Sequence, residues 1–131
     1  MKIMKDMKKR FSKHSNHIIG CAIEVHRNLG PGLLESIYEQ CLAQEFWLTG
    51  INFKRQEALP IEYKGIYLDC GYRIDLLVED EIIIEIKSVN EIIGIHEAQI
   101  LTYMKLAKIK YGLLINFNVT LLKDGLKSFI L

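Results

Sequence analysis

The segment that most constrains the fold is residues 82–89, an isoleucine-rich run interrupted by Glu85 and Lys87. A short, nearly continuous apolar run of β-branched residues is typical of a central strand buried on both faces. Because Glu85 and Lys87 are two positions apart, their side chains leave the same face of that strand. Burying an unpaired carboxylate or ammonium costs several kcal/mol, so both groups must meet each other, a metal ion or water.

The remaining periodicity predicts one α/β domain around this strand. Apolar residues at helical spacing predict helices over residues 15–28, 33–48 and 95–107. The other expected strands are residues 53–63, 66–68, 72–78, 111–117 and 126–131. This order predicts an α/β sandwich, in which helices cover a mixed sheet. The 131 residues suit a single domain.

Asp75 poses the same burial problem on the preceding strand, and the turn between the two strands decides where it lies. A three-residue loop over residues 79–81 would pair Val78 with Ile82 and place Asp75 opposite Glu85. A two-residue loop would move Asp75 to the other face of the sheet. We expect the three-residue loop, because it brings the two carboxylates together.

Two opposed carboxylates and a nearby lysine suit phosphate chemistry. The carboxylates could hold Mg²⁺ or Mn²⁺, which lowers the pKa of a water molecule and offsets charge on a phosphate. Lys87 could orient the attacking water or stabilise the charged phosphate. The alternative is a buried network of ion pairs without catalysis, which places similar charges inside sheets.

The same residues resemble a known nuclease core. Asp75 is followed, after nine residues, by Glu85-x-Lys87, which resembles the PD-(D/E)XK nucleases. The segment GLLESIY at residues 32–38 resembles the signature of the GxxExxY proteins, a small branch of that superfamily. Residues 24–27, 29–32, 71–78 and 114–118 are also similar to that branch. The resemblance covers nearly the whole chain.

The resemblance implies a restriction-endonuclease-like αβββαβ core and metal-dependent hydrolysis of phosphodiester bonds. It assigns Asp75 and Glu85 as ligands of Mg²⁺, for which Mn²⁺ can substitute, and Lys87 as the catalytic lysine. It also makes Glu35 a candidate extra acidic residue of the site. The alternative for Glu35 is a first-turn glutamate favoured by the helix dipole. The chain departs from the eponymous motif at Ile74, where that motif has proline.

A polar seam lies on the helix expected at residues 95–107. His96, Gln99 and Tyr103 fall on one side of that helix. The Gln99-x-x-x-Tyr103 spacing resembles a glutamine–tyrosine motif of nucleases from bacterial recombination helicases. Gln99 could orient a water molecule or a phosphate, while Tyr103 and His96 are candidate nucleic-acid contacts. The alternatives are the wet edge of an amphipathic helix and, for His96, a surface histidine.

The leading hypothesis is therefore a metal-dependent nuclease acting on DNA, with RNA as the alternative substrate. A catalytically silent nucleic-acid-binding module on the same fold is the second.

Residues 1–14 form a basic arm that could contact phosphates or be a solvated terminus, and residues 15–131 form the nuclease-like domain. The apolar runs are too short to span a bilayer, so a cytoplasmic protein is expected. The terminal strand at residues 126–131 is a candidate surface for a homodimer.

Overall fold

The computed structural model describes the backbone of residues 2–131 and the side chains of residues 9–131. The helices are α1 (Lys2–Leu29), α2 (Glu35–Thr49), α3 (Gly94–Ala107) and the short 3₁₀ helix η1 (Leu122–Gly125). The strands are β1 (Phe53–Ala58), β2 (Ile61–Tyr63), β3 (Ile66–Leu68), β4 (Arg73–Val78), β5 (Ile82–Lys87), β6 (Tyr111–Asn116) and β7 (Leu126–Ile130).

The main sheet has five strands in the order β1-β4-β5-β6-β7. β5 and β6 run parallel, and the other neighbouring pairs are antiparallel. The parallel pair is connected through α3, as parallel strands require a long crossover. The expected single α/β domain, with a mixed sheet flanked by helices, is confirmed.

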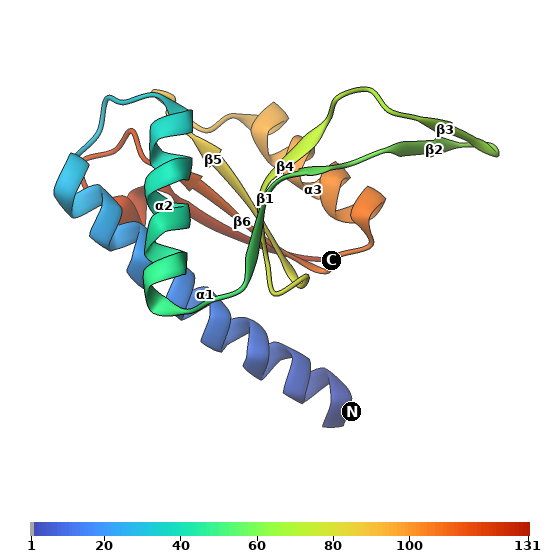
Figure 1. Ribbon diagram of the computed structural model, residues 1–131, viewed down its shortest axis with the longest axis horizontal. Coiled ribbons are helices and arrows are strands. Elements are labelled where there is room, and N and C mark those ends of the chain that lie inside the picture. The colour runs from blue at the N-terminus through green and yellow to red at the C-terminus, as the bar shows by residue number, and fades with distance from the viewer. Residues whose placement is uncertain (1) are drawn as a thin grey trace.

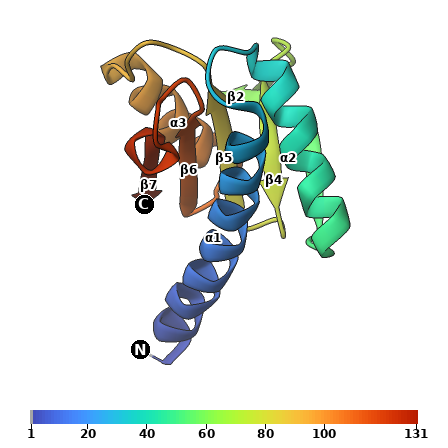
Figure 2. The ribbon, with the colours of Figure 1, turned by 90° about the vertical axis from the view of Figure 1, so that its left-hand side faces the viewer.

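Helices cover both faces of the sheet. α1 and α2 lie on one face and α3 on the other (Figures 1 and 2). On the first face, Ile82, Ile84 and Ile86 pack into the larger apolar core, and on the second Ile83 packs against α3 residues such as Met104. Alternate β5 residues therefore enter opposite cores, which explains the continuous run of isoleucine.

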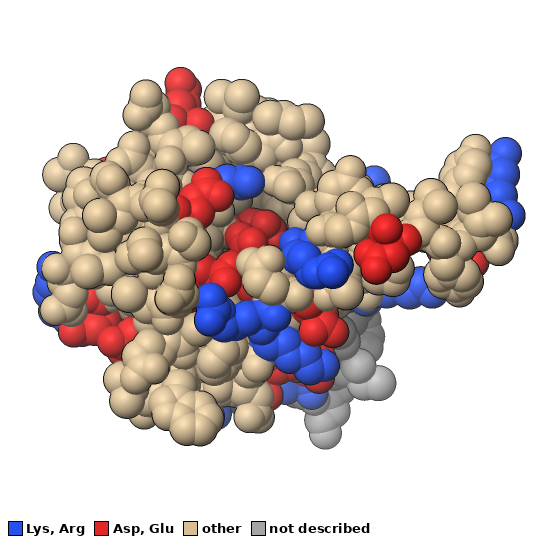
Figure 3. All heavy atoms as spheres, turned by 45° about the horizontal axis from the view of Figure 1, so that its top comes forward, with Lys and Arg blue, Asp and Glu red and all other residues tan. Residues whose placement is uncertain are grey.

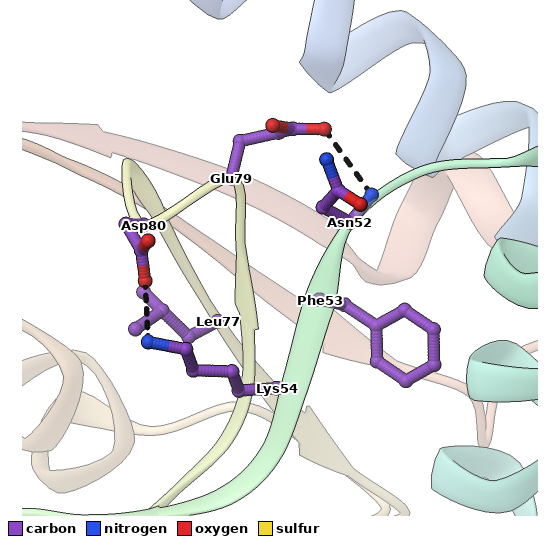
Figure 4. Close-up of a pocket in the computed structure, with 6 residues that line it drawn as sticks. All are labelled: Asn52, Phe53, Lys54, Leu77, Glu79 and Asp80. Atoms are coloured by element: carbon purple, nitrogen blue, oxygen red, sulfur yellow. Dashed lines mark hydrogen bonds and ion pairs between the residues drawn. The ribbon is translucent and has the colours of Figure 1, made fainter.

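The β4–β5 turn has the three-residue loop expected from the sequence. Val78 pairs with Ile82, and the Glu81 N–H donates to the Val78 carbonyl oxygen at 2.9 Å. The turn is attached to β1 by its side chains (Figure 4): the Asn52 N–H donates to Glu79 Oε1 at 3.2 Å, and Lys54 Nζ lies 3.0 Å from Asp80 Oδ1. These contacts fix the register that the site depends on.

Two elements differ from the expected boundaries. α1 begins at Lys2 rather than at residue 15, because Phe11 is buried and stacks on Tyr111 with ring centroids 4.3 Å apart. The extended segment expected at residues 53–63 is two strands. β1 joins the main sheet, whereas β2 pairs with β3 in a separate hairpin that projects from the body (Figure 1).

Two further expectations concern the surface. β7 is an edge strand, with Ile130 and Leu131 exposed at its end. The side chains of Lys2, Lys5 and Lys8, which belong to the expected basic arm, lie outside the described residues. Within the described part of the chain, no helix has the length and apolar character needed to cross a membrane.

Candidate active site

Asp75 and Glu85 lie where β4 and β5 separate. The paired part of the two strands ends at Leu76 and Ile84. Beyond that pair, the Asp75 N–H donates to Glu85 Oε1 at 3.2 Å, and the Ile86 N–H donates to Asp75 Oδ2 at 2.9 Å. Each carboxylate thus accepts a hydrogen bond from the backbone of the other strand. The two side chains fill the fork between the strands and lie next to each other.

This arrangement raises the pKa of Glu85, which is only 4% exposed. Burial is the main cause that raises its pKa to about 9, and the charge of Asp75 adds to the effect. The positive charge of Lys87 acts in the opposite direction. At neutral pH the protonated form of Glu85 is therefore favoured, as expected for a carboxyl group buried next to a second one.

Lys87 is held by α3. Its Nζ atom donates to Gln99 Oε1 at 3.0 Å, and Gln99 Nε2 donates to the Tyr103 hydroxyl oxygen at 3.1 Å. Burial raises the pKa of the Tyr103 hydroxyl. Among the ion pairs of the described side chains, none joins Lys87 to Asp75 or Glu85. Lys87 therefore donates its hydrogen bond to the side-chain amide of Gln99.

The chain that leaves β5 is anchored on two sides. The Ser88 N–H donates to Glu35 Oε2 at 3.1 Å, and the Ser88 hydroxyl donates to the Leu33 carbonyl oxygen at 2.6 Å. On the other side, the Asn116 side chain accepts from the Val89 N–H at 3.1 Å and donates to the Val89 carbonyl oxygen at 2.9 Å. These bonds hold the residues that follow Lys87. Glu35 serves here as an anchor at the start of α2.

The GLLESIY segment forms the turn that places α2. Gly30 and Gly32 have φ of 68° and 96°, a left-handed region that favours glycine. The Tyr38 hydroxyl donates to the Gly30 carbonyl oxygen at 2.6 Å and accepts from the Leu33 N–H at 3.1 Å. Tyr38 is fully buried and stacks on Phe117 with ring centroids 4.5 Å apart. Gly30, Gly32 and Tyr38 together thus set the position of Glu35.

Glu39, Arg55 and Gln56 are site residues that sequence reasoning missed. The buried Glu39 carboxylate accepts from Arg55 Nη2 at 3.0 Å and from Gln56 Nε2 at 2.5 Å. Gln56 Nε2 also lies 3.3 Å from Asp75 Oδ1, and its backbone has a left-handed φ of 50°. The sequence held one signal for Glu39: it follows Glu35 by four residues, and residues four apart lie on the same face of a helix.

A hollow of about 480 Å³ opens beside these residues. Its lining is formed by Glu35, Ser36, Glu39, Gln56 and Asp75. Figure 3 shows acidic side chains inside a hollow on this face, with lysine and arginine side chains around it. Acidic groups surrounded by basic ones can bind a cation and the phosphate that accompanies it.

His96 has a structural contact of its own. Its Nδ1 atom accepts from the Ile93 N–H at 3.1 Å, and the His96 N–H donates to the Ile93 carbonyl oxygen at 3.0 Å. These bonds cap the beginning of α3, where backbone N–H groups lack helical partners. The histidine lies one turn before Gln99 on the same helix. The structure thus joins Lys87, Gln99 and Tyr103 in one chain of contacts and leaves His96 at the helix end.

The donor set fits a hard divalent cation. Among the described residues, no three histidine, cysteine, aspartate or glutamate side chains form a group that could hold a metal ion. Mg²⁺, however, is commonly held by one or two carboxylates together with water and substrate phosphates. Asp75 and Glu85 supply such a pair, and a bound cation would take the place of the proton that the raised pKa of Glu85 favours.

The fold and this geometry agree with a comparison against protein families. The family model described as the PD-(D/E)XK nuclease superfamily matches residues 12–129. The chain belongs to this superfamily. Comparisons with curated proteins and with solved structures gave no match. As a member of the PD-(D/E)XK superfamily, the chain has a nuclease-type fold.

Proposed function

We propose that this protein is a metal-dependent nuclease that hydrolyses phosphodiester bonds in nucleic acid, with DNA as the favoured substrate. The observation that carries the proposal is the pair of adjacent carboxyl groups in the β4–β5 fork, with the lysine of the same motif two residues further on. Membership of the nuclease superfamily supports it. The GLLESIY segment supports placing the chain in the GxxExxY branch.

Asp75 and Glu85 would hold the cation, Mg²⁺ or Mn²⁺, and Glu35 is a further carboxylate beside the same hollow. When bound, the cation would neutralise phosphate charge and lower the pKa of a water molecule. Ionised Asp75 and Glu85 are needed for this, so Glu85 must release its proton on binding. Gln56, on β1, contacts Asp75 from the side opposite to β5.

Lys87 would bind a non-bridging phosphate oxygen or orient the attacking water. Its position depends on the amide oxygen of Gln99, which in turn is held by the Tyr103 hydroxyl. A lysine bound to a neutral amide keeps its charge available for phosphate, whereas a lysine paired with a carboxylate would not. We assign Lys87 the catalytic role and Gln99 the role of positioning it. Tyr103 and His96, on the same helix, are proposed contacts of the nucleic-acid backbone.

The test compares purified wild-type protein with Lys87→Ala. The substrates are single-stranded, duplex and flapped DNA together with RNA, each with Mg²⁺, Mn²⁺ or a chelator. We expect wild-type cleavage that the chelator abolishes, and loss of cleavage in Lys87→Ala with the metal-dependent thermal stabilisation retained. Lysine does not ligate Mg²⁺, so metal binding and catalysis are separable at this position.

Lys123→Ala, at an exposed position in η1, is the matched control and should cut as well as the wild type. Cleavage that survives in Lys87→Ala would contradict the assignment of the catalytic lysine. Binding of nucleic acid by the wild type without cleavage of any substrate, under any metal, would instead identify a silent binding module.

A further inference from the structure

A second groove lies on the α3 side of the sheet, away from the carboxylate hollow. It has a volume of about 270 Å³ and is lined by Ile61 of β2, by Tyr72 just before β4, and by the outward side of α3. The residues from α3 include Ile95, Gln99, Thr102 and Tyr103. The groove is slightly smaller than a typical ligand pocket of roughly 300–1,000 Å³, which suits a flat ring better than a larger molecule.

The groove is apolar but open to solvent. Tyr72 is 46% exposed and Ile95 is 68% exposed. None of the described side chains that line it is charged. Apolar side chains gathered in one exposed concave place are typical of a binding surface, whereas scattered ones are not. Because none of these side chains is charged, the groove offers its occupant mainly apolar and aromatic contact.

The groove is connected to the catalytic lysine. Gln99 and Tyr103 line it, and the same Gln99 accepts the hydrogen bond from Lys87 Nζ at 3.0 Å. A strand whose phosphate is bound at Lys87 therefore has its neighbouring nucleotide beside this groove. The Tyr72 and Tyr103 rings meet edge to face, with centroids 6.1 Å apart, so the groove has an aromatic wall on the side of the sheet.

We infer that this groove binds an unpaired nucleobase next to the phosphate held by Lys87. The inference rests on the proposed nuclease function and gives its substrate class: single-stranded or locally unpaired nucleic acid. Bases stack on exposed aromatic side chains without regard to sequence. A base inside an intact duplex cannot enter such a groove unless it leaves the stack, which costs free energy. The same reasoning makes Tyr72 a specificity residue of the site.

The experiment measures binding rather than turnover, in the full wild-type chain with a chelator in place of metal so that no strand is cut. The probe is a fluorescent single-stranded DNA of roughly 12 nucleotides, and its blunt duplex is compared by anisotropy. In this background we compare Tyr72 with Tyr72→Ala and with Tyr72→Phe, which retains the ring. Tyr67→Ala is the matched control, because Tyr67 is 73% exposed on β3 and does not line the groove.

We expect the single strand to bind more tightly than the duplex. Tyr72→Ala should raise its dissociation constant about fivefold or more, as for the loss of one stacked base. Tyr72→Phe and Tyr67→Ala should leave it unchanged. A second series of probes each lacks the base at one position. At one position, loss of the base should raise the dissociation constant of the protein with Tyr72 but not that of Tyr72→Ala.

Equal affinity for the single strand and the duplex, or equal affinity with and without the Tyr72 ring, would overturn the inference. A third contrary result would be light scattering that gives the mass of two chains for the protein with Tyr72 and of one chain for Tyr72→Ala. The last would mean that a second copy covers the groove. The proposed function is tested separately, because cleavage is measured with wild-type protein in the presence of metal. Base-dependent binding without any cleavage would overturn only the catalytic proposal.

Discussion

The Oε1 atom of Glu85 lies 3.2 Å from the backbone nitrogen of Asp75, one residue beyond the last paired residues of β4 and β5. The Asp75 carboxylate makes the corresponding contact with the Ile86 nitrogen at 2.9 Å. The two carboxyl groups thus complete the backbone hydrogen bonding of the fork in which they lie. Because the two carboxyl groups bond to the backbone of the sheet, substitutions at these positions should change stability as well as chemistry.

Glu85→Gln should make the metal-free protein more stable at high pH. The pKa of Glu85 is raised from 4.5 to about 9 in the folded protein. The folded state thus binds this proton more tightly than the unfolded chain, and the resulting stability is complete below pH 4.5 and is lost as pH rises toward 9. Glutamine stays neutral throughout. Thermal unfolding at pH 5, 7 and 9 should show a variant advantage that grows with pH.

Glu62→Gln, at an exposed position on β2, is the control for that experiment and should follow the wild-type curve. A difference between Glu85→Gln and the wild type that stays constant across the pH range would show that the Glu85 proton is not bound more tightly on folding.

Asp75→Asn should abolish stabilisation by Mg²⁺ and Mn²⁺. A ligand that binds only the folded state raises the unfolding free energy, by about 2.7 kcal/mol when it is present at 100 times its dissociation constant. Asparagine keeps an oxygen that can accept from the Ile86 N–H, but it removes one of the two charges. Melting temperatures with and without metal provide the measurement. The wild-type shift should be larger at pH 8 than at pH 6, because binding must displace the Glu85 proton.

The same Asp75→Asn variant should be at least as stable as the wild type without metal, because it relieves the repulsion between the two carboxyl groups. An unchanged response to metal in this variant would remove Asp75 from the list of ligands.

Gln99→Ala should lower kcat more than it raises KM. Without the amide oxygen at 3.0 Å, Lys87 loses its orientation, and a misplaced catalytic group can cost roughly a hundredfold in rate. Metal-dependent stabilisation should not change. Gln99→Glu keeps an oxygen acceptor but pairs the lysine with a carboxylate, so it should not recover the rate. Steady-state kinetics on the substrate found to be cut best provides the measurement.

Glu97→Gln is the matched control on the same helix, because Glu97 pairs with Lys127 at 2.9 Å instead of with the site. A loss confined to KM in Gln99→Ala would assign Gln99 to substrate binding instead of to positioning the lysine.

Glu39→Ala should lower both stability and metal response. The buried carboxylate binds Arg55 and Gln56, whose side chains are exposed, so their donors can turn to water and its removal should cost about 1 kcal/mol. Gln56 would no longer be aimed at Asp75, so the metal-dependent shift in melting temperature should also decrease. Gln44→Ala, exposed on the same helix, should change neither quantity. A stability loss with a normal metal response would make Glu39 purely structural.

The order of elements could be read from the sequence because it follows from local periodicity. The isoleucine run of β5 and the helical spacing in α2 and α3 each reflect burial of one segment against a core. The boundaries that differ depend on distant partners. α1 extends to Lys2 because Phe11 packs on Tyr111, a residue far away in the sequence. β1 and β2 separate because only β1 has β4 as a neighbour.

The burial of charged residues on apolar strands was enough to predict that Asp75 and Glu85 lie together. Asp75, Glu85 and Lys87 stand in strands too apolar to hold them singly, and the length of the β4–β5 turn followed from pairing the two carboxylates. The contacts of these side chains depend on the three-dimensional packing. Gln99 binds Lys87, and Gln56 joins Glu39 to Asp75, through pairs drawn from separate elements. Such contacts depend on how a helix is placed over a sheet, and no periodicity within one segment encodes that placement.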